Sequence, residues 1–214
     1  MLPRRQSDRG EGSDVVSWCF HIRRRRGEDR AQSQAWRSLG NFCNLDRVWK
    51  HTSLSTARKV AVYNAIVVSR LLYGLSSAWL NAAEIRRLNG FHCRCLRKIT
   101  RIRPSFVSRV SNAAVLMRAH EHPLSSYLRY QQLLLFGRVA RALAGDALRR
   151  ATFHHGLEPA TNRYVRRVGR PRNEWARMLR EEACKMSPQS ESLIRDVSAW
   201  QRQSGFFLFV SNVP

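Results

Sequence analysis

The stretch AAEIRRLNGFHCRCLRKITR (residues 82–101) has the clearest amphipathic pattern in the chain and indicates its fold class. At about 100° per residue, its apolar side chains gather on one side of a helix. The residues on that side are Ile85, Leu88, His92, Cys95, Leu96 and Ile99. Four cations lie within roughly 60° of one another on the other side, by the same helical angle: Arg87, Arg94, Lys98 and Arg101. The stretch therefore predicts a helix with a buried face and a basic face, ended by Pro104.

Helical patterns continue on both sides of this stretch. Arg30–Lys50 repeats apolar residues every three or four positions. Thr56–Leu75, capped by Ser53 or Ser55, is apolar on nearly all sides, which predicts a central buried helix. Its β-branched run also fits a strand, but the absence of a turn signal favours a helix. Further helices are expected at 112–119, 124–143, 174–186 and 191–201. The fold class is therefore mainly α, an irregular helical bundle.

Composition divides the chain into five expected segments. Residues 1–29 are rich in Arg, Asp, Gly and Ser and are predicted to be a disordered Arg-rich segment. Residues 30–145 are predicted to form one helical domain, and 146–173 a basic loop that contains Pro and Gly. Short C-terminal helices are expected over 174–204. The apolar tail at 205–214 has no period and receives no assignment.

The charge is strongly unbalanced. The 214 residues include 38 Lys or Arg and 15 Asp or Glu, a net charge of +23. From Arg47 to His120 there are fourteen bases and one acid, Glu84. A solvated charged face normally mixes both signs, and so many like charges repel one another without a partner. The composition favours a polyanionic partner, nucleic acid first and an acidic membrane second.

Several classes of protein are disfavoured. The longest charge-free stretches are too short for a membrane-spanning helix, and the N-terminus lacks the apolar block of a secretory signal. Five cysteines, at positions 19, 43, 93, 95 and 184, form no disulfide framework and suggest a reducing compartment. We therefore expect an intracellular protein, nuclear or cytoplasmic, that is not secreted and has no membrane segment.

Catalytic and metal chemistry has little support in the sequence. The six aspartates are not neighbours, although two-metal nucleotidyl transfer needs clustered carboxylates, and no phosphate-binding loop is present. His92, Cys93 and Cys95 invite a zinc interpretation, but only one residue separates the cysteines. The simpler interpretation makes Cys95 a small core residue and places Cys93 near the border. We expect no catalytic residues, no metal and no cofactor.

The basic residues suit a phosphate backbone, because guanidinium groups hydrogen-bond phosphate oxygens in pairs. The helical face extends to Arg103 and Arg109. A second basic stretch contains VGRPR (residues 168–172), which is similar to the Arg-Gly-Arg-Pro core of a minor-groove AT-hook. Val168 replaces the expected arginine, so a plain basic connector is the simpler interpretation. The predicted nucleic-acid-binding residues are Arg87, Arg94, Lys98, Arg101, Arg103, Arg166, Arg167, Arg170 and Arg172.

An ordered series of short motifs resembles a known family. The series comprises Leu54–Lys59, Val62–Ser69, Leu71–Gly74 with Trp79, Arg87–Ile99, Ser111-Asn112, Pro123-Leu124, Gln131–Arg141 and Val168–Trp175. Across about Arg30–Met186 the chain resembles the C-terminal part of reverse transcriptases encoded by non-LTR retrotransposons. The resemblance implies the thumb and its continuation, which follow the catalytic palm and hold the template–primer duplex and the target-bound RNA.

The family's Phe/Tyr-x-Asp-Asp catalytic motif does not occur in this sequence. The resemblance therefore implies a remnant of a truncated or decayed element that binds RNA or DNA without catalysis. Three alternatives stay open. One is a protein-interaction module built from Thr56–Leu75 and Leu124–Leu143. Another is a chain without selected function, left incomplete by loss of the palm that packed on Phe42, Trp49 or Leu72. The last is an active polymerase fragment.

Overall fold

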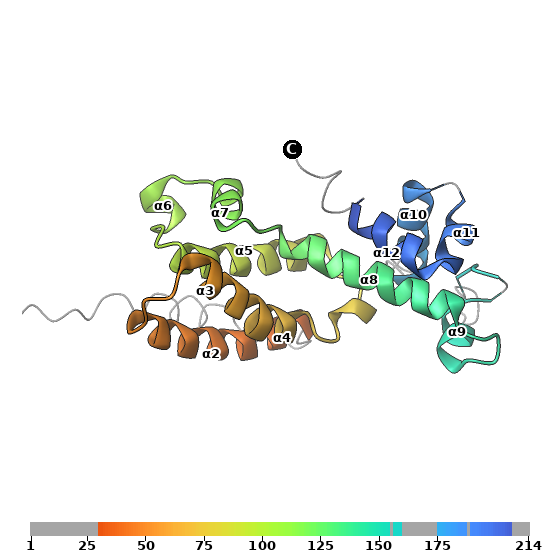
Figure 1. Cartoon of the computed structure of the whole chain (residues 1–214). Helices are drawn as coiled ribbons and strands as arrows, with labels where there is room; N and C mark the ends of the chain where they lie inside the picture. Colours follow the sequence, from red (N-terminus) through yellow and green to blue (C-terminus); the bar gives the residue numbers. More distant parts are fainter. Residues whose placement is uncertain (1–29, 155, 160–174, 188, 207–214) are drawn as a thin grey trace, which may run out of the picture.

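A computed structural model of the chain describes residues 30–154, 156–159, 175–187 and 189–206. These residues form helices joined by short loops, and their only β pairing is an isolated antiparallel bridge between Phe153 and Pro159 (Figure 1). The predicted mainly α class is confirmed. The predicted disordered segment 1–29, much of the 146–173 loop and residues 207–214 of the tail lie outside the described residues.

The elements follow one another along the chain in this order: α2 Arg30–Lys50, α3 Thr56–Tyr63, the π-helical turn η1 Asn64–Val68, α4 Ser69–Leu72, the 3-10 turn η2 Leu75–Ser77, α5 Ala82–Ile99, α6 Ser105–Ser108, α7 Asn112–Ala119, α8 Leu124–Arg141, α9 Ala147–Thr152, α10 Trp175–Met186, α11 Ser190–Arg195 and α12 Val197–Gly205. None of the helices among the described residues is long and apolar enough to cross a lipid bilayer.

Local capping explains where the helices of the first half begin. The Ser55 hydroxyl accepts a hydrogen bond from the main-chain nitrogen of Arg58, so Ser55 rather than Ser53 caps α3. Helix α5 begins with a full capping box between Asn81 and Glu84, at 2.9 and 2.6 Å. Ser111 caps α7 by accepting a hydrogen bond from the main-chain nitrogen of Ala114 at 3.2 Å. These short polar residues satisfy the free N–H groups of each first turn and fix its position.

Several boundaries differ from those predicted. The helix predicted over 56–75 contains the π-helical turn η1 and ends at Leu72, and the helix predicted over 124–143 ends at Arg141. Helix α5 ends at Ile99, well before Pro104, because Arg101 adopts a left-handed conformation there. The segment 146–173, predicted to be a loop, begins with α9, whose first turn is capped by the Asp146 carboxylate. The single helix predicted at 191–201 is two helices, because Asp196 leaves the helical conformation and caps α12.

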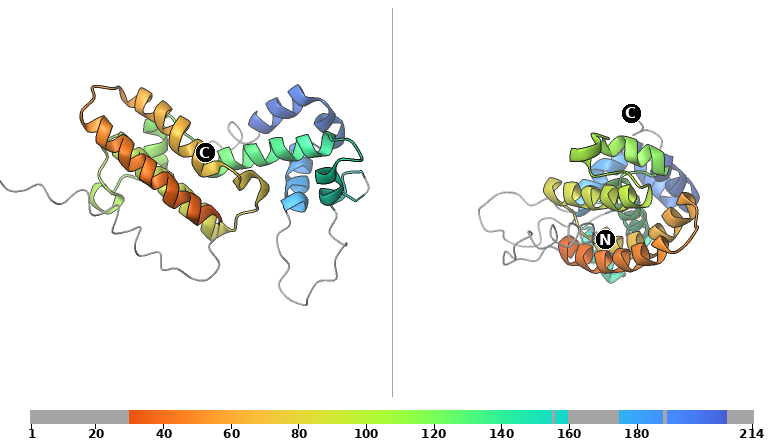
Figure 2. Two further views of the ribbon diagram at one scale, coloured as in Figure 1. Left: turned by 90° about the horizontal axis from the view of Figure 1, so that it is seen from below. Right: turned by 90° about the vertical axis from the view of Figure 1, so that its left-hand side faces the viewer.

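The helices pack around two hydrophobic cores, and α8 runs through both (Figures 1 and 2). We call residues 30–128 the N-lobe and residues 129–206 the C-lobe. The N-lobe core is built by α2, the α3–α4 segment, α5, α7 and the first turns of α8. Its most deeply buried side chains are Phe42, Tyr63, Val67, Leu71, Leu75, Leu96, Val115 and Leu124.

The C-lobe core forms around Trp200, which is completely buried. The Trp200 indole packs directly on Gly137 of α8, and its Nε1 donates to the carbonyl oxygen of Leu133 at 3.0 Å. Phe136 meets Phe153 edge-on, with ring centroids 5.5 Å apart. The second half of α8, which lies within the domain predicted at 30–145, therefore packs in the C-lobe core.

The packing of the apolar helices bears on two of the alternatives. Phe42, Trp49 and Leu72, which the incomplete-fold hypothesis left exposed, are 1%, 6% and 2% exposed and pack within this chain. The apolar faces expected to form an interaction module, at 56–75 and 124–143, mostly cover the two cores instead. The part of the chain that the structure describes thus covers its own large core side chains.

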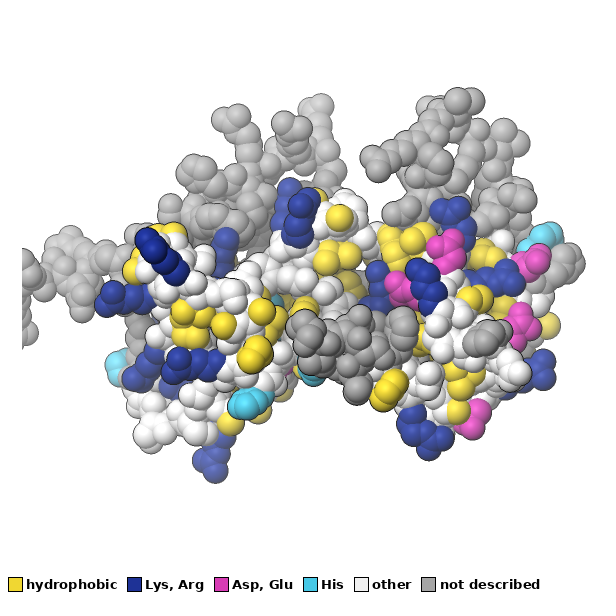
Figure 3. All heavy atoms as spheres, turned by 90° about the horizontal axis from the view of Figure 1, so that it is seen from above, with side chains coloured by type: hydrophobic (Ala, Val, Ile, Leu, Met, Phe, Trp, Pro, Cys, Tyr) yellow, Lys and Arg dark blue, Asp and Glu magenta, His cyan; other side chains and the backbone are white. Residues whose placement is uncertain are grey.

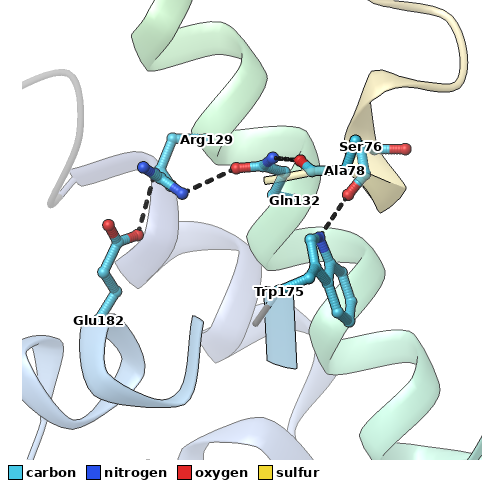
Figure 4. A network of polar contacts seen from close by, with 6 residues as sticks. All are labelled: Ser76, Ala78, Arg129, Gln132, Trp175 and Glu182. Carbon is cyan, nitrogen blue, oxygen red and sulfur yellow. Dashed lines mark hydrogen bonds and ion pairs between the residues drawn. The ribbon is translucent and has the colours of Figure 1, made fainter. Parts of the chain in front are cut away.

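Main-chain carbonyl groups join the segment after α4 to the C-terminal helices (Figure 4). Gln132 of α8 is buried, and its Nε2 donates to the carbonyl oxygen of Ala78 at 2.5 Å. Trp175 of α10 donates from Nε1 to the carbonyl oxygen of Ser76 at 2.7 Å. Both donors lie on the C-lobe side, so these bonds fix the position of residues 76–78 against α8 and α10.

Arg129 of α8 completes this junction (Figure 4). Its guanidinium donates to Gln132 Oε1 at 2.9 Å, lies 3.2 Å from Glu182 Oε2 and stacks 3.7 Å from the ring centroid of Trp79. Burial raises the pKa of Glu182, and the charge of Arg129 offsets only part of that shift. The junction is therefore a partly buried polar contact in which the charge of Arg129 compensates only part of the burial of Glu182.

Candidate nucleic-acid interface

Helix α5 presents three of the predicted cations on one exposed face. Arg87, Arg94 and Lys98 are exposed, while Leu88 and Leu96 of the same helix are buried in the N-lobe core. The capping box fixes the start of the helix, and core packing fixes its rotation. The amphipathic pattern of the sequence therefore predicts this face correctly, up to the last turn of α5.

Lys98 has an acidic neighbour that the sequence does not reveal. Its Nζ lies 3.8 Å from Asp46 Oδ2 on α2, with side-chain exposures of 34% and 28%. A pair this exposed and this long contributes about 0–1 kcal/mol, because water screens it. Lys98 thus remains able to exchange this partner for a phosphate group.

Arg101 and Arg103 lie beyond the helix rather than on its face, which corrects the predicted position of Arg101. The main-chain nitrogens of Arg101 and Ile102 donate back to the carbonyl oxygens of Lys98 and Arg97, at 3.3 and 2.8 Å. This pattern is a Schellman motif, whose left-handed position favours glycine. Arg101 occupies it with φ 58°. A non-glycine residue there costs about 1 kcal/mol.

The loop of residues 100–111, which we call the α6 loop, is held by a buried arginine that sequence reasoning missed. Arg97 is only 6% exposed. Its guanidinium donates to the carbonyl oxygens of Arg103 and Val110 and to Asn112 Oδ1, at 3.3, 2.6 and 3.1 Å. On the helix, Arg97 lies roughly 80° from Arg87, at the border of the basic face. That border position is the signal that could have identified it.

Large apolar side chains in the α6 loop were also missed. Phe106 and Val107 are 85% and 50% exposed, in the single helical turn α6. Arg109 follows them with φ 53°, a second arginine in the left-handed region. The sequence signal was present, because Phe106 and Val107 interrupt a polar and basic stretch without belonging to any helical period.

The second group of predicted residues is not placed. Arg166, Arg167, Arg170 and Arg172 lie outside the described residues, and so does the whole VGRPR motif. The AT-hook interpretation and the connector interpretation therefore both stay predictions. The candidate interface consists of the α5 face and the α6 loop.

The histidine and cysteines of α5 form part of the N-lobe core. His92 is completely buried, and its Nδ1 lies 2.9 Å from the hydroxyl oxygen of Tyr63. Burial lowers the pKa of His92 to about 4, although a main-chain contact with His122 opposes the shift. Burial also raises the pKa of the Cys95 thiol, which confirms Cys95 as a core residue.

Cys93 is only 4% exposed, so its predicted border position is wrong. Burial raises the pKa of its thiol, and the nearby charge of Arg97 opposes that shift. Cys43, Cys93, Cys95 and Cys184 are all free thiols. In the part of the chain that the structure describes, no three metal-ligating side chains come together.

Charge separates the two lobes clearly. The N-lobe contains sixteen Lys or Arg and three Asp or Glu. The described residues of the C-lobe contain ten and six. On the face shown in Figure 3, the carboxylates gather over the C-lobe, whereas lysine and arginine side chains lie over both. The positive potential of this surface is therefore strongest at the N-lobe.

Comparisons with known proteins returned no match. No family model, no curated protein and no solved structure matches this chain. Function must therefore be inferred from the geometry and charge of the site itself.

Proposed function

We propose that the N-lobe binds nucleic acid through its phosphates, using the α5 face and the α6 loop. The observation that carries this proposal is the excess of sixteen bases over three acids on a folded helical lobe. Like charges at this density repel one another, and a polyanion relieves that repulsion. Because phosphate contacts carry little sequence information, we expect weak sequence preference.

The resemblance to the thumb and post-thumb region of non-LTR retrotransposon reverse transcriptases supports the same role. We infer that this chain is a remnant of such an enzyme and binds without catalysis, since its sequence lacks the Phe/Tyr-x-Asp-Asp motif. In a primer-extension assay with the purified chain, we expect no product. A product would overturn the non-catalytic part of the proposal.

The direct test removes charge from one lobe at a time. The triple variant R94A/K98A/R101A neutralises three cations of the candidate interface. The matched control R138A/R195A/R202A removes the same charge from exposed positions of the C-lobe. Affinity for a fluorescein-labelled duplex is measured by anisotropy across a series of salt concentrations.

We expect the N-lobe variant to weaken binding to all duplexes similarly. The log–log slope of affinity against salt should flatten by about 2, since each lost phosphate contact removes about 0.7–0.9. The C-lobe control should bind almost as the unchanged chain does. Equal losses of affinity in the two variants would mean that binding depends on net charge alone and not on this interface. Unchanged affinity of the N-lobe variant would refute the interface.

A further inference from the structure

The α6 loop combines an exposed aromatic ring with a row of arginines. Phe106 is 85% exposed and packs against neither core. The two ends of the loop are anchored, because Ile102 and Val110 pack against the N-lobe core. The exposed arginines of the loop are Arg101, Arg103 and Arg109. Within the described part of the chain, none of these three forms a salt bridge.

Hydrogen bonds hold the loop in the shape that exposes the ring. The Ser108 hydroxyl donates to the carbonyl oxygens of Arg103 and Pro104, at 3.0 and 3.2 Å. Arg97 links the two ends of the loop by donating hydrogen bonds to the carbonyl oxygens of Arg103 and Val110. Phe106 is therefore exposed by a fixed turn and keeps a defined position relative to the arginines.

Backbone conformation gives an independent observation. Arg101 and Arg109 both have left-handed φ angles, of 58° and 53°, which arginine adopts at a cost. Residues held in such conformations cluster at ligand-binding sites. Here both strained residues carry a guanidinium group and lie on either side of Phe106 in the loop.

We propose that Phe106 stacks against an unpaired nucleobase while the neighbouring arginines hold the adjoining phosphates. This inference rests on the proposed function and names its substrate class: single-stranded nucleic acid, or an unpaired stretch beside a duplex. An unpaired base offers a free face to an aromatic ring, whereas a paired base inside a duplex does not. Arginine suits this role better than lysine, because its planar group binds phosphate oxygens in pairs and also stacks.

An acidic membrane is the less favoured partner. Phe106 and Val107 occupy a single helical turn, and such a turn lacks the long apolar face with which amphipathic helices enter a bilayer. One exposed ring among arginines matches the stacking and phosphate contacts of single-stranded nucleic-acid sites more closely.

The test uses the full chain and compares two nucleic acids of equal length, an oligo-dT single strand and a blunt-ended duplex. Phe106→Ala should weaken single-strand affinity between about fivefold and a hundredfold, the range for one base–aromatic stack. It should leave duplex affinity and the salt slope unchanged. Phe106→Trp should keep the affinity, and its fluorescence should be quenched by the bound base. Leu143→Ala, which removes a side chain 84% exposed on the C-lobe, is the matched control and should change nothing.

Each other outcome separates this inference from the proposed function. Unchanged single-strand binding by Phe106→Ala overturns the stacking role, while the charge-removal test of the N-lobe still stands. Equal losses of affinity for the single strand and for the duplex also overturn the stacking role, because they indicate a general structural effect. If the unchanged chain binds neither the single strand nor the duplex, the proposed function is wrong. If Phe106→Ala instead releases the chain from phosphatidylserine vesicles and leaves single-strand binding intact, the loop is a membrane contact and the inference is wrong.

Discussion

The two lobes share helix α8 but differ in charge and in the size of their cores. The C-lobe centres on one buried tryptophan, pairs Arg129 with Glu182 and Arg177 with Glu181, and contains ten bases for six acids in its described residues. The N-lobe has a larger buried cluster and carries sixteen bases for three acids. The lobe with the larger core is therefore also the one that carries the charge excess.

Backbone strain follows the same division. Among the described residues, all three non-glycine residues with positive φ lie in the N-lobe: Arg101, Arg109 and His120. The glycines with positive φ are Gly74 in the N-lobe and Gly156 in the C-lobe. The non-glycine residues that adopt this costly conformation therefore all belong to the N-lobe, and two of them are arginines of the α6 loop.

The largest expected effect is loss of the C-lobe by Trp200→Ala. Removing this completely buried side chain leaves a cavity and frees the Leu133 carbonyl group, so we expect a loss of about 3–5 kcal/mol in the free energy of unfolding. Hydrogen exchange should show lost protection in α10–α12 and the second half of α8, with α2 and α5 still protected. Equal loss of protection in both lobes would mean that they unfold as a single cooperative unit.

Gly137 provides an independent check of the same contact. A methyl group added at Gly137 would lie 2.7 Å from Cδ1 of the Trp200 ring, a distance that forces the ring to move. Gly137→Ala should therefore destabilise the same helices as Trp200→Ala. Arg202→Ala on α12, an exposed position, serves as the control and should change stability by less than about 0.5 kcal/mol.

Acidification should affect the two lobes in opposite directions. The pKa of His92 is about 4 in the folded N-lobe and 6.5 in the unfolded chain. The unfolded chain therefore binds the proton first as the pH falls. The contribution of neutral His92 to the free energy of unfolding is therefore fully present above pH 6.5. It is lost between pH 6.5 and 4, by about 3 kcal/mol in total.

Glu182 has the reverse sign in the C-lobe. Burial raises the pKa of Glu182 above the usual 4.5, so its carboxylate binds a proton in the folded C-lobe before it does so in the unfolded chain. As the pH falls, protonation removes the cost of burying the charged carboxylate, and the stability of the C-lobe rises. Hydrogen-exchange protection factors measured per lobe at several pH values check both signs. His92→Gln keeps a hydrogen-bonding group beside Tyr63 and should flatten the N-lobe profile; an unaltered profile would assign the acid sensitivity to other groups.

Local signals explain how much of this architecture the sequence could predict. The positions of α2, α5, α7 and α8 follow from apolar periodicity and from caps such as Asn81 and Ser111, which act within one helical turn. Asp196 carried the same kind of signal, since its carboxylate accepts from the next turn and divides the helix predicted at 191–201. Better use of capping rules would have found that break.

Contacts between distant segments were out of reach of such rules. The pair of Lys98 with Asp46, the hydrogen bond from Arg97 to the carbonyl oxygen of Val110 and the contact of Gly137 with Trp200 each join segments that only the fold brings together. The division of α8 between two cores has the same origin, because a continuous apolar helix gives no local sign of changing partners. The basic face of α5 was predictable, whereas its extension into a fixed loop was not.

The smallest expected effect tests why the N-lobe keeps a strained arginine. Arg101→Gly places glycine at the left-handed position of a Schellman motif, where glycine is favoured, while glycine's freedom in the unfolded chain offsets part of the gain. We expect a rise of up to about 1 kcal/mol in the free energy of unfolding, together with weaker nucleic-acid binding. Arg101→Ala keeps the strain and should lose affinity without gaining stability.

In the C-lobe, Gly156→Arg makes the reverse change at an open position and should lower stability by a similar amount. Urea unfolding and anisotropy on the same samples measure both quantities. Opposite signs for stability and affinity would mean that this arginine is kept for binding at the expense of the fold, and parallel losses in Arg101→Gly would show that it serves only packing.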